Sequence, residues 1–457
     1  MRLKVSMSSQ TEMALEQAAP DAGLLSRLFA TADRIMVKKL RNNDRDWAHN
    51  RSKHQAGVFI PVETRDSGFF PELTVKKRKQ AGAAEIREAF FLTVWPQVGE
   101  ERTSHIVHYT SKGNETHLTV LPKAAFADLL PASFLVMGRQ KKRDGWRYEC
   151  LTIDSGGDEF ELLRDLFGLQ ADFVSGVFEP AVIRSEEQEK VLDFAGEVIA
   201  AWMQGEIGFF ADGRAAMPTT LDLAREAQAV FMRERGLTKI DPFALEAPGD
   251  DLRTLSRTIE WNLFREHQHR KYAVELVRLV MGETPYTPSP ADIIRRLIDT
   301  RQEIDALMLS AGQQRKSRAG YSYEHHIEVM LRDGGIPFEK QVVLESKKRP
   351  DFILPSLSFV DSDRFDAKTG LILSAKTTLR ERWKQVEREM GGRPLFLTTV
   401  DENIAGSVIE DMASIGVRLV IPESLLKAKE AEYAGHANVV GFGQFCRDFI
   451  KPHLAAW

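Results

Sequence analysis

The sequence is poor in the features that mark secreted, membrane-spanning and zinc-binding proteins. It has two cysteines among 457 residues, Cys150 and Cys446, which lie far apart and lack a paired histidine motif. A disulfide framework and a zinc cluster are therefore not supported, and we expect two buried free thiols. No apolar run approaches the roughly 20 residues of a membrane span, and the first residues lack the apolar core of a signal peptide. We expect a cytoplasmic protein.

The net charge is also small, -4, so that overall composition does not indicate a nucleic-acid partner. Basic residues are nevertheless clustered. One such cluster is usually a solvated face, but several of them, two flanking the acidic motif discussed below, favour a polyanion as partner. The basic runs are "DRIMVKKLRNNDRDWAHNRSKH", "TVKKRKQ", "GRQKKRDGW", "QQRKSRAG" and "ESKKRPD".

The first third of the chain has a β pattern. Short apolar runs such as "EAFFLTVW" and "SFLVMGR" are broken by turn residues from about residue 25 to residue 173. Short segments at this spacing predict a mostly β barrel or sandwich. From about residue 185 the apolar period becomes helical, which marks a boundary. The predicted limits are 1–175 for the first domain, 176–212 for a linker and 213–457 for the second domain.

The rest of the chain has helical spacing first and then an alternation of strands and helices. Pro218 before Thr219 and Thr220 predicts a helix start. After Gly320 we expect a helix that is ended by a glycine pair, which suits a left-handed cap. The apolar runs from "KQVVLE" to "VRLVIP" alternate with helical segments such as "IAGSVIEDMASIG". This order predicts a mixed α/β core with a central sheet.

Two residues suited to phosphodiester chemistry stand at the ends of neighbouring predicted strands. Asp351 in "KKRPDFILPS" would begin one strand, and Lys376 in "LILSAKTTLRERWKQVEREM" would end the next, so both could lie at one sheet edge. A magnesium ion held by carboxylates, with a lysine nearby, can neutralise charge on phosphorus and activate water. Alternatively, Asp351 is a turn acid and Lys376 a structural lysine at a strand end.

The second carboxylate of such a site is not two residues before the lysine, where this sequence has Ser374. Glu389 is the best candidate, because it lies on the predicted helix that begins at Thr377 and Thr378, beside Lys376. A helix that starts at this edge can carry a carboxylate that reaches the metal. The geometry allows this arrangement but does not decide it. Glu389 could instead be solvated.

The segment "TLRER" has two interpretations. Thr378 and Glu381 have the spacing of a capping box, in which the glutamate only closes the helix start. In the other interpretation, Arg380 and Arg382 donate bidentate bonds to guanine edges while Glu381 accepts from cytosine amino groups, which suits G·C pairs in the major groove. One glutamate cannot serve fully in both, so the two interpretations stay open.

Four motifs occur together and in order, namely "QQRKSRAGYSYEHHIE", "KKRPDFILPS", "LSAKTTLRERWKQ" and "SIGVRLVIPESL". Together they resemble the catalytic domain of the EcoRII-like family of type II (type IIE) restriction endonucleases. The segments "QAGVFIP", "FFPEL" and "GNETHLT" are similar to the effector domain of that family. The resemblance implies an N-terminal, mostly β DNA-binding pseudobarrel and a C-terminal α/β nuclease core of the PD-(D/E)XK type with a central mixed sheet.

The resemblance also implies catalytic roles. Asp351, Lys376 and Glu389 would form a magnesium-dependent catalytic set, in which Asp351 and Glu389 ligate the metal. Glu324 would be an accessory acid near this set. The family cuts before a CC-containing site of five base pairs and flips out the bases of the central pair.

The resemblance implies DNA contacts in both domains. Arg380, Glu381 and Arg382 would read the outer C and G pairs. Trp261 would stack on a flipped base, with Arg257 as the opposing plane, and this stacking would recover part of the cost of flipping. The alternative for Trp261 is a place on the apolar stripe of a core helix. The other candidate DNA-binding residues are Arg315 in the second domain and His54, Lys112, Asn114, Glu115 and His117 in the first.

The resulting hypothesis is a magnesium-dependent restriction endonuclease that cuts double-stranded DNA at a CCWGG-like site and is activated by a second site bound to the first domain. We expect a homodimer, because a palindromic site requires two related active sites, and functional pairing with a cytosine DNA methyltransferase. The alternatives are a catalytically silent DNA-binding regulator and a repair or mobile-element nuclease with another target. The intact set of Asp351, Lys376 and Glu389 argues against the regulator.

Overall fold

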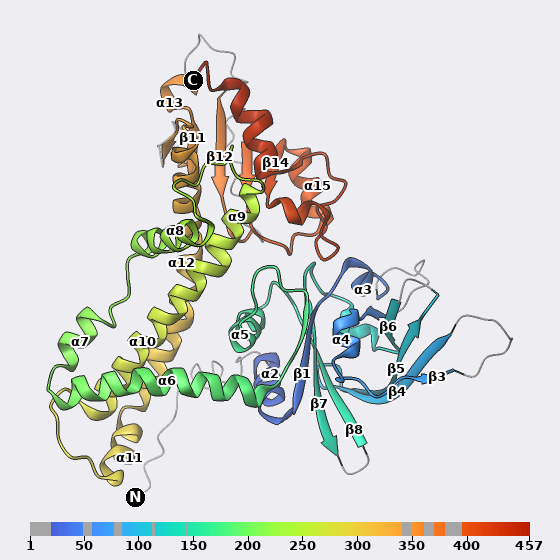
Figure 1. The fold of residues 1–457 in the computed structure, drawn as a ribbon, viewed down its shortest axis with the longest axis vertical. Helices are drawn as coiled ribbons and strands as arrows, with labels where there is room; N and C mark the ends of the chain where they lie inside the picture. Colours follow the sequence, from blue (N-terminus) through green and yellow to red (C-terminus); the bar gives the residue numbers. More distant parts are fainter. Residues whose placement is uncertain are drawn as a thin grey trace, which may run out of the picture. The chain divides into compact units, whose positions relative to one another are not determined.

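The chain folds into two compact units (Figure 1). The computed structural model describes residues 20–48, 57–76, 85–111, 115–142, 145–340, 349–360, 370–379 and 395–457. Unit 1 comprises the residues up to 186 together with 402–405 and 429–432, and unit 2 comprises the remainder.

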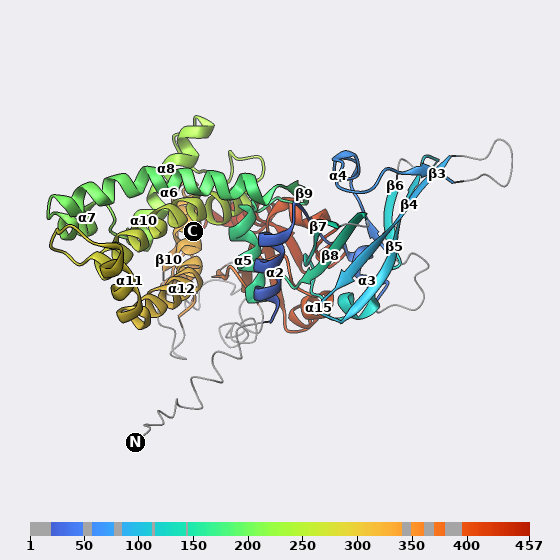
Figure 2. The same cartoon turned by 90° about the horizontal axis from the view of Figure 1, so that it is seen from below.

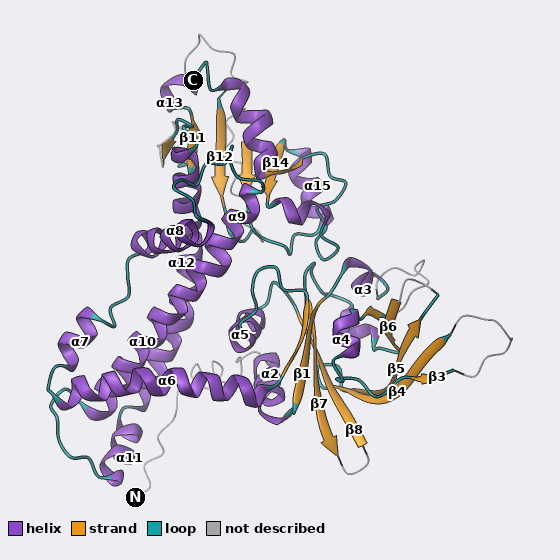
Figure 3. Ribbon diagram, in the orientation of Figure 1, coloured by secondary structure: helices purple, strands orange, loops and turns teal. Residues whose placement is uncertain are grey.

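Unit 1 is built on a nine-stranded sheet, shown in orange in Figure 3. The strand order is β2-β6-β5-β4-β8-β7-β1-β9, and β3 pairs with β4. These pairs are antiparallel except for the parallel pair of β4 with β8. The strands are β1 (Arg34–Lys39), β2 (Val58–Phe59), β3 (Thr74–Val75), β4 (Ile86–Trp95), β5 (Glu100–Tyr109), β6 (Glu115–Thr119), β7 (Phe134–Lys142), β8 (Gly145–Ile153) and β9 (Ser175–Phe178).

The two faces of this sheet carry separate hydrophobic clusters, because side chains alternate along a strand. On β1, Ile35 and Val37 belong to the cluster covered by helices α2 (Pro20–Thr31) and α5 (Asp158–Phe167), which Figure 2 shows beside the sheet. Met36 belongs to the other cluster, which also takes Val58 from β2. Since β1 and β2 are far apart in the strand order, the sheet curves around this second cluster. The mostly β character is as predicted, whereas the pseudobarrel stays a prediction.

The first basic run of unit 1 is partly buried. Lys38 on β1 has no exposed surface, and its Nζ lies 2.6 Å from Asp44 Oδ2. Asp44, on helix α3 (Asn42–Asp46), also accepts the backbone N–H of Phe59 at 2.7 Å. Desolvation lowers the pKa of Lys38, although Asp44 opposes this effect. The expectation that this run offers its charges to a polyanion is therefore wrong for Lys38. The sequence alone does not reveal this, because a lysine with a buried partner has the same sequence pattern as a solvated lysine.

Unit 2 combines a six-stranded mixed sheet with long helices. The strand order is β10-β11-β12-β13-β14-β15. Strand β11 is antiparallel to β10 and β12, whereas β12 to β15 are parallel, which confirms the predicted mixed α/β core. The strands are β10 (Glu339–Lys340), β11 (Phe352–Leu354), β12 (Leu371–Ala375), β13 (Leu395–Thr398), β14 (Val417–Ile421) and β15 (Val439–Gly441).

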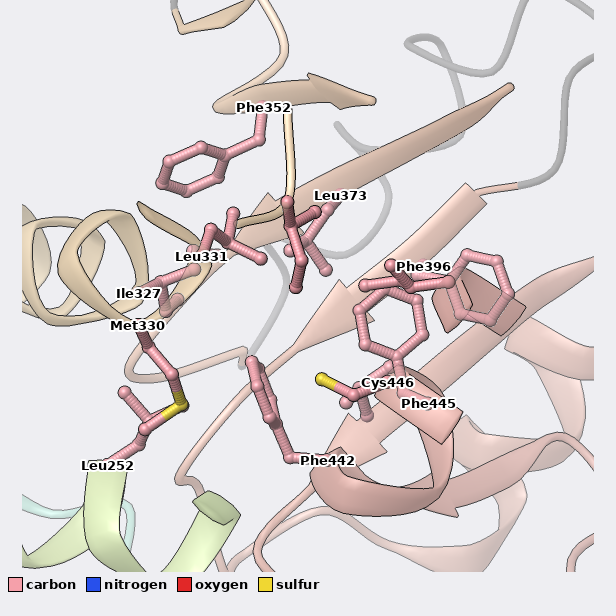
Figure 4. Packing of buried hydrophobic residues seen from close by; sticks show 14 of the residues in the cluster. Leu252, Ile327, Met330, Leu331, Phe352, Leu373, Phe396, Phe442, Phe445 and Cys446 are labelled. Atoms are coloured by element: carbon pink, nitrogen blue, oxygen red, sulfur yellow. The ribbon is translucent and has the colours of Figure 1, made fainter. Parts of the chain in front are cut away.

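The helices of unit 2 supply much of its core. Phe352, Leu373 and Phe396 of the sheet pack with Ile327 of α12 and Phe445 near the C-terminus (Figure 4). The helices and helical turns described in this part of the chain are α6 (Pro180–Met203), α7 (Ile207–Gly213), α8 (Thr220–Arg235), α9 (Pro248–Thr254), the π-helical turn η2 (Leu255–Ile259), α10 (Glu260–Met281), α11 (Pro290–Asp299), α12 (Arg301–Asp333), α13 (Leu357–Val360), α15 (Gly406–Ser414), η4 (Glu423–Lys427), α16 (Phe442–Gln444), the π-helical turn η5 (Phe445–Ile450) and η6 (Lys451–His453). The remaining described helices, in unit 1, are α4 (Val62–Asp66) and η1 (Lys123–Phe126).

Several predicted helix limits can be compared with the structure. The hydroxyl of Thr219 accepts the N–H of Asp222, so α8 begins as expected. By contrast, α12 begins at Arg301, not after Gly320. Gly335 beyond its end has a φ of 64°, the left-handed conformation expected of the glycine pair. The stretch 176–212, expected to be a linker, contains α6 and most of α7.

The two cysteines agree with the expectation from composition. Cys150 and Cys446 are buried and free, and burial raises the pKa of both thiols. Within the described ranges, no helix is both long enough and apolar enough to cross a membrane.

Candidate active site

The structure brings Asp351 and Lys376 together at one edge of the sheet of unit 2. Asp351 Oδ2 accepts a hydrogen bond from Lys376 Nζ at 2.7 Å and another from the backbone N–H of Ala375 at 2.7 Å. Their side chains keep 13% and 26% of their surface exposed, so a phosphate group could reach both. The prediction that the two residues meet at a sheet edge is confirmed.

The pairing of β11 with β12 produces this contact. Phe352 lies opposite Leu373 in an antiparallel register. Asp351 directly precedes β11 and Lys376 directly follows β12, so the register carries both to the same end of the strand pair. Ser374 stands two residues before Lys376, where the sequence lacks the second carboxylate of such a site, and it is fully buried in the sheet.

The backbone beyond Lys376 is fixed by neighbouring strands and helices. The N–H of Lys376 donates to the carbonyl of Thr398 at the end of β13, at 3.0 Å. The hydroxyls of Thr398 and Tyr323 lie 2.8 Å apart, which connects β13 to α12. Burial raises the pKa of the Tyr323 phenol, so the group stays protonated as a hydrogen-bonding link. Sequence reasoning missed Thr398 and Tyr323, since neither side chain is charged at neutral pH.

Glu324, the expected accessory acid, lies next to Tyr323 on α12 and is 8% exposed. A buried carboxylate is costly unless it is paired or hydrogen-bonded. Its position on the helix that contacts β13 is compatible with a role near the site. The role itself stays a prediction.

Arg257 lies in the π-helical turn η2, and Trp261 lies in the first turn of the helix α10 that follows it. Such single turns with an inserted residue are frequent at functional sites. Arg257 Nη2 donates to the carbonyl of Thr377 at 2.8 Å, which places this guanidinium beside the segment that follows the lysine. Trp261 is partly buried, with its ring centroid 5.8 Å from that of Phe264. Both the stacking interpretation and the core interpretation of Trp261 stay open.

A buried polar network joins the helices behind this turn. His326 Nε2 lies 2.6 Å from Glu260 Oε2, and the amide of Gln228 lies 3.1 Å from His326 Nδ1. His326 is fully buried, and Glu260 and Gln228 are nearly so. The network connects α8, α10 and α12. Sequence reasoning missed it, because a histidine within a helical apolar pattern has no sign of a distant partner.

The carboxylate chemistry of Asp351 fits a magnesium ion. Within the described residues, the hydrogen bonds of Asp351 go to Oδ2, which leaves Oδ1 as a hard oxygen donor at a partly exposed edge. Magnesium is usually bound by one or two carboxylates together with waters and phosphate oxygens. The described residues contain no group of three or more acids, histidines or cysteines that could hold a metal. The predicted second ligand, Glu389, lies outside these residues.

The other predicted DNA-contacting residues are only partly covered by the structure. In unit 1, Glu115 is exposed on β6, and its carboxylate lies 3.5 Å from His117 Nε2. The ring of His117 also makes an edge contact with Phe59 on β2. The positions outside the described residues are His54, Lys112, Asn114, Arg380, Glu381 and Arg382, and for Arg315, on α12, the side chain is outside them. Both interpretations of "TLRER" therefore stay predictions.

Residues 292–446 match the family model described as EcoRII C terminal, and this range includes Asp351 and Lys376. The C-terminal region is EcoRII-like. The type II restriction enzyme EcoRII of Escherichia coli is 36% identical over 156 residues, which cover 34% of this chain and 38% of that enzyme. The type II restriction enzyme SsoII of Shigella sonnei is 28% identical over 194 residues, which cover 40% of this chain and 62% of that enzyme. The match thus spans less than two thirds of either relative.

A solved structure is also similar to part of the chain. Metal-depleted Ecl18kI in complex with uncleaved, modified DNA aligns with a TM-score of 0.43 and 24% identity, over 53% of this chain and 81% of that one.

Proposed function

We propose that the protein is a type II site-specific deoxyribonuclease that hydrolyses phosphodiester bonds of double-stranded DNA at a CCWGG-like site and requires magnesium. The observation that carries the proposal is the contact between Lys376 Nζ and Asp351 Oδ2 at 2.7 Å, at a partly exposed sheet edge within the EcoRII-like region. In the part of the chain that the structure describes, the hydrogen bonds of Asp351 go to Oδ2, so that Oδ1 can face a metal while the neighbouring ammonium group faces a phosphate.

In this proposal water attacks phosphorus directly. Asp351 and Glu389 would hold magnesium, which supplies charge neutralisation and a more acidic bound water. Lys376 would stabilise the charge that develops on the phosphate or orient the water. The bond to Asp351 keeps Lys376 Nζ at the edge, so little reorganisation is needed when DNA arrives. Glu324 would support this set from α12.

The DNA-reading part of the proposal uses the segment directly after this edge. Arg380, Glu381 and Arg382 would read the outer C and G pairs in the major groove. Trp261 would stack on a flipped base opposite Arg257. The hydrogen bond from Arg257 to the Thr377 carbonyl supports this placement, because it locates the guanidinium beside the segment that leads to Arg380.

The remaining parts of the proposal concern partners. Unit 1 would bind a second copy of the site and activate cleavage, with His117 and Glu115 among its DNA contacts. Two copies of the chain would act on the two strands of a palindromic site. The enzyme would work in the cytoplasm beside a cytosine DNA methyltransferase that protects the host sites.

The test is digestion of plasmids that carry one or several CCWGG sites, with magnesium or with EDTA, followed by sequencing of the cut ends. We expect magnesium-dependent cuts before the first C, faster on plasmids with more sites. Cuts at another sequence would support the nuclease activity but contradict the CCWGG-like specificity. Binding without any cut, at every metal concentration, would instead support a DNA-binding regulator.

A further inference from the structure

A π-helical turn connects the buried polar network of unit 2 to the candidate active site. The turn η2 is closed by the backbone N–H of Glu260, which donates to the carbonyl of Leu255. Within the turn, Arg257 Nη2 donates to the carbonyl of Thr377 at 2.8 Å. Thr377 directly follows Lys376. The residue that closes the turn therefore stands three positions after the residue that contacts the backbone beside the lysine.

The side chain of Glu260 is held by helix α12. His326 Nε2 lies 2.6 Å from Glu260 Oε2. The Gln228 amide nitrogen lies 3.1 Å from His326 Nδ1 and donates to the carbonyl of His325 at 3.4 Å. Because a carbonyl only accepts, the amide NH2 faces both groups and His326 Nδ1 is an acceptor. The imidazole proton is therefore on Nε2, which donates to the Glu260 carboxylate.

Burial gives this hydrogen bond its structural weight. His326 has no exposed surface, and Glu260 is 4% exposed. A buried carboxylate is costly unless it is hydrogen-bonded, so Glu260 requires the imidazole donor. Apolar packing is non-directional, whereas a satisfied polar network specifies one arrangement of the elements that it joins. The pair thus fixes α10 against α12 at the residue that closes the π-helical turn.

Helix α12 also supports the lysine from the side of the sheet. Tyr323 precedes His326 by three residues, so both lie on one side of the helix. The hydroxyl of Tyr323 lies 2.8 Å from that of Thr398, whose carbonyl accepts the backbone N–H of Lys376 at 3.0 Å. One helix therefore fixes both the strand that receives the lysine N–H and the turn that carries Arg257.

We propose that Glu260 and His326 are positioning residues for the proposed cleavage reaction. Their hydrogen bond fixes the π-helical turn, so that Arg257 stays at the Thr377 carbonyl and Lys376 stays at the sheet edge. Neither side chain of the pair touches DNA, and both act on the rate of cleavage through Arg257. The inference rests on the proposed function of the protein as a nuclease.

The test is a double-mutant cycle in the full-length chain. His326→Leu removes the donor to Glu260, and Arg257→Ala removes the group through which the pair acts. The two single variants and the double variant are compared with the wild type in single-turnover cleavage. The protein is in saturating excess over DNA, so that the rate constant does not depend on the folded fraction. His326→Gln is the conservative variant, because its side-chain amide can still donate to Glu260.

For His326→Leu we expect cleavage to slow on the order of 100-fold, the effect of an error of about 1 Å in positioning. Arg257→Ala should be at least as slow. The double variant should cleave at the rate of Arg257→Ala, because the effect of His326 requires Arg257. His326→Gln should recover most of the rate. Losses that multiply in the double variant would overturn the inference, since the pair would then act independently of Arg257.

Asp333→Ala is the matched control for a loss of stability. Asp333 lies at the end of α12, and its Oδ2 accepts the N–H of Ile240 at 2.7 Å. Its replacement therefore also removes a hydrogen bond between α12 and another part of unit 2. This variant should keep the wild-type rate constant. A rate as low as that of His326→Leu would also overturn the inference, because any weakening of α12 would then suffice.

Hydrogen exchange gives a second measurement that does not depend on cleavage. A peptide of residues 371–379 should exchange faster in His326→Leu and in Arg257→Ala than in the wild type and in Asp333→Ala. Equal exchange in all four proteins would contradict the proposed support of this backbone. A wild type that cuts no DNA would overturn the proposed function instead, while the exchange rates would still decide whether His326 holds the backbone at Lys376.

Discussion

Lys376 Nζ lies 2.7 Å from Asp351 Oδ2, although 25 positions separate the two residues in the sequence. The antiparallel register of β11 and β12 creates this contact at the common end of the two strands. If Asp351 were only a turn acid and Lys376 only a structural lysine at a strand end, neither role would require a contact between them. The Lys376 ammonium donates to the Asp351 carboxylate at a partly exposed edge, so the two side chains form one ion pair there.

Replacement of Lys376 by alanine should separate binding from catalysis. We expect Lys376→Ala to bind the cognate duplex and to cleave it on the order of 100- to 1000-fold more slowly, as is typical when one group that stabilises developing charge is removed. Binding is measured without magnesium, and cleavage is measured in single turnover.

Lys340 provides the matched control for this prediction. Its Nζ forms an ion pair with Glu328 at 2.9 Å in the same unit. Lys340→Ala should therefore lose a comparable ion pair and keep its cleavage rate. Cleavage at the wild-type rate by Lys376→Ala would remove Lys376 from the mechanism.

Replacement of Asp351 by asparagine tests the metal. The amide oxygen of Asp351→Asn can still accept the N–H of Ala375, but the charge that would hold magnesium is lost. Cleavage should fall on the order of 100-fold or more at saturating magnesium, because metal-ion charge stabilisation is lost, and the magnesium concentration for half-maximal rate should rise. Calorimetric titration with magnesium, in the presence of uncleaved DNA, measures the binding without turnover. Wild-type cleavage that persists in EDTA would contradict a metal-dependent mechanism.

The strand pattern could be predicted because it follows from local periodicity. "EAFFLTVW" lies within β4, where Phe91 and Trp95 are buried while Phe90 and Leu92 on the other face are exposed. "SFLVMGR" lies in β7 except for its first residue, and its apolar residues alternate between the two hydrophobic clusters of unit 1. The contact of Asp351 with Lys376 could be predicted as well, because adjacent strands bring their ends together. Strand β1 was missed as a strand because its lysines resemble a solvated run, and only the burial of Lys38 against Asp44 reveals its place.

The start of α12 could not be predicted from the same signals. Gly320 and the polar run before it resemble a break between elements, yet both lie inside the helix. An interior glycine costs only about 1 kcal/mol relative to alanine, which tertiary packing can offset. The π-helical turn that carries Arg257 is equally hidden, since one inserted residue leaves the apolar pattern of the helix almost unchanged.

The residues that support the backbone of the candidate site could not be predicted from the sequence, for another reason. Asp401 and Arg257 contact Leu379 and Thr377 through backbone groups. Every residue offers such groups, so the sequence does not mark which amide or carbonyl receives a distant side chain. Catalytic residue types can therefore be found by their chemistry, whereas the residues that position them require the fold.

Asp251 should make the stability of unit 2 depend on pH. Burial raises the pKa of this carboxyl to about 6 from 3.8, although Arg235, 2.6 Å away, lowers it. Because the folded state holds this proton more tightly than the unfolded state does, the contribution of Asp251 is most favourable below about pH 3.8 and is lost as pH rises to about 6. The total change corresponds to about 3 kcal/mol, from about 1.4 kcal/mol per pKa unit.

Asp251→Asn isolates this effect, because its amide does not titrate. The free energy of unfolding of the wild type, minus that of the variant, should decrease between pH 4 and pH 6.5. Urea denaturation at a series of pH values measures the difference. A difference that rises over this range would show that Arg235 outweighs burial and that the pKa is lowered.

The buried pair of Lys38 and Asp44 should be a major determinant of the stability of unit 1. Lys38→Met leaves the Asp44 carboxylate buried without its cation, which costs roughly 3 to 5 kcal/mol of unfolding free energy for such pairs. Lys76→Met is the control, because Lys76 pairs with Glu88 but is half exposed, and such surface pairs contribute about 1 kcal/mol or less. Urea denaturation of both variants gives the comparison. Equal losses in the two variants would mean that water or another group replaces the Lys38 ammonium, and that the burial of this basic run is not what holds β1 to α3.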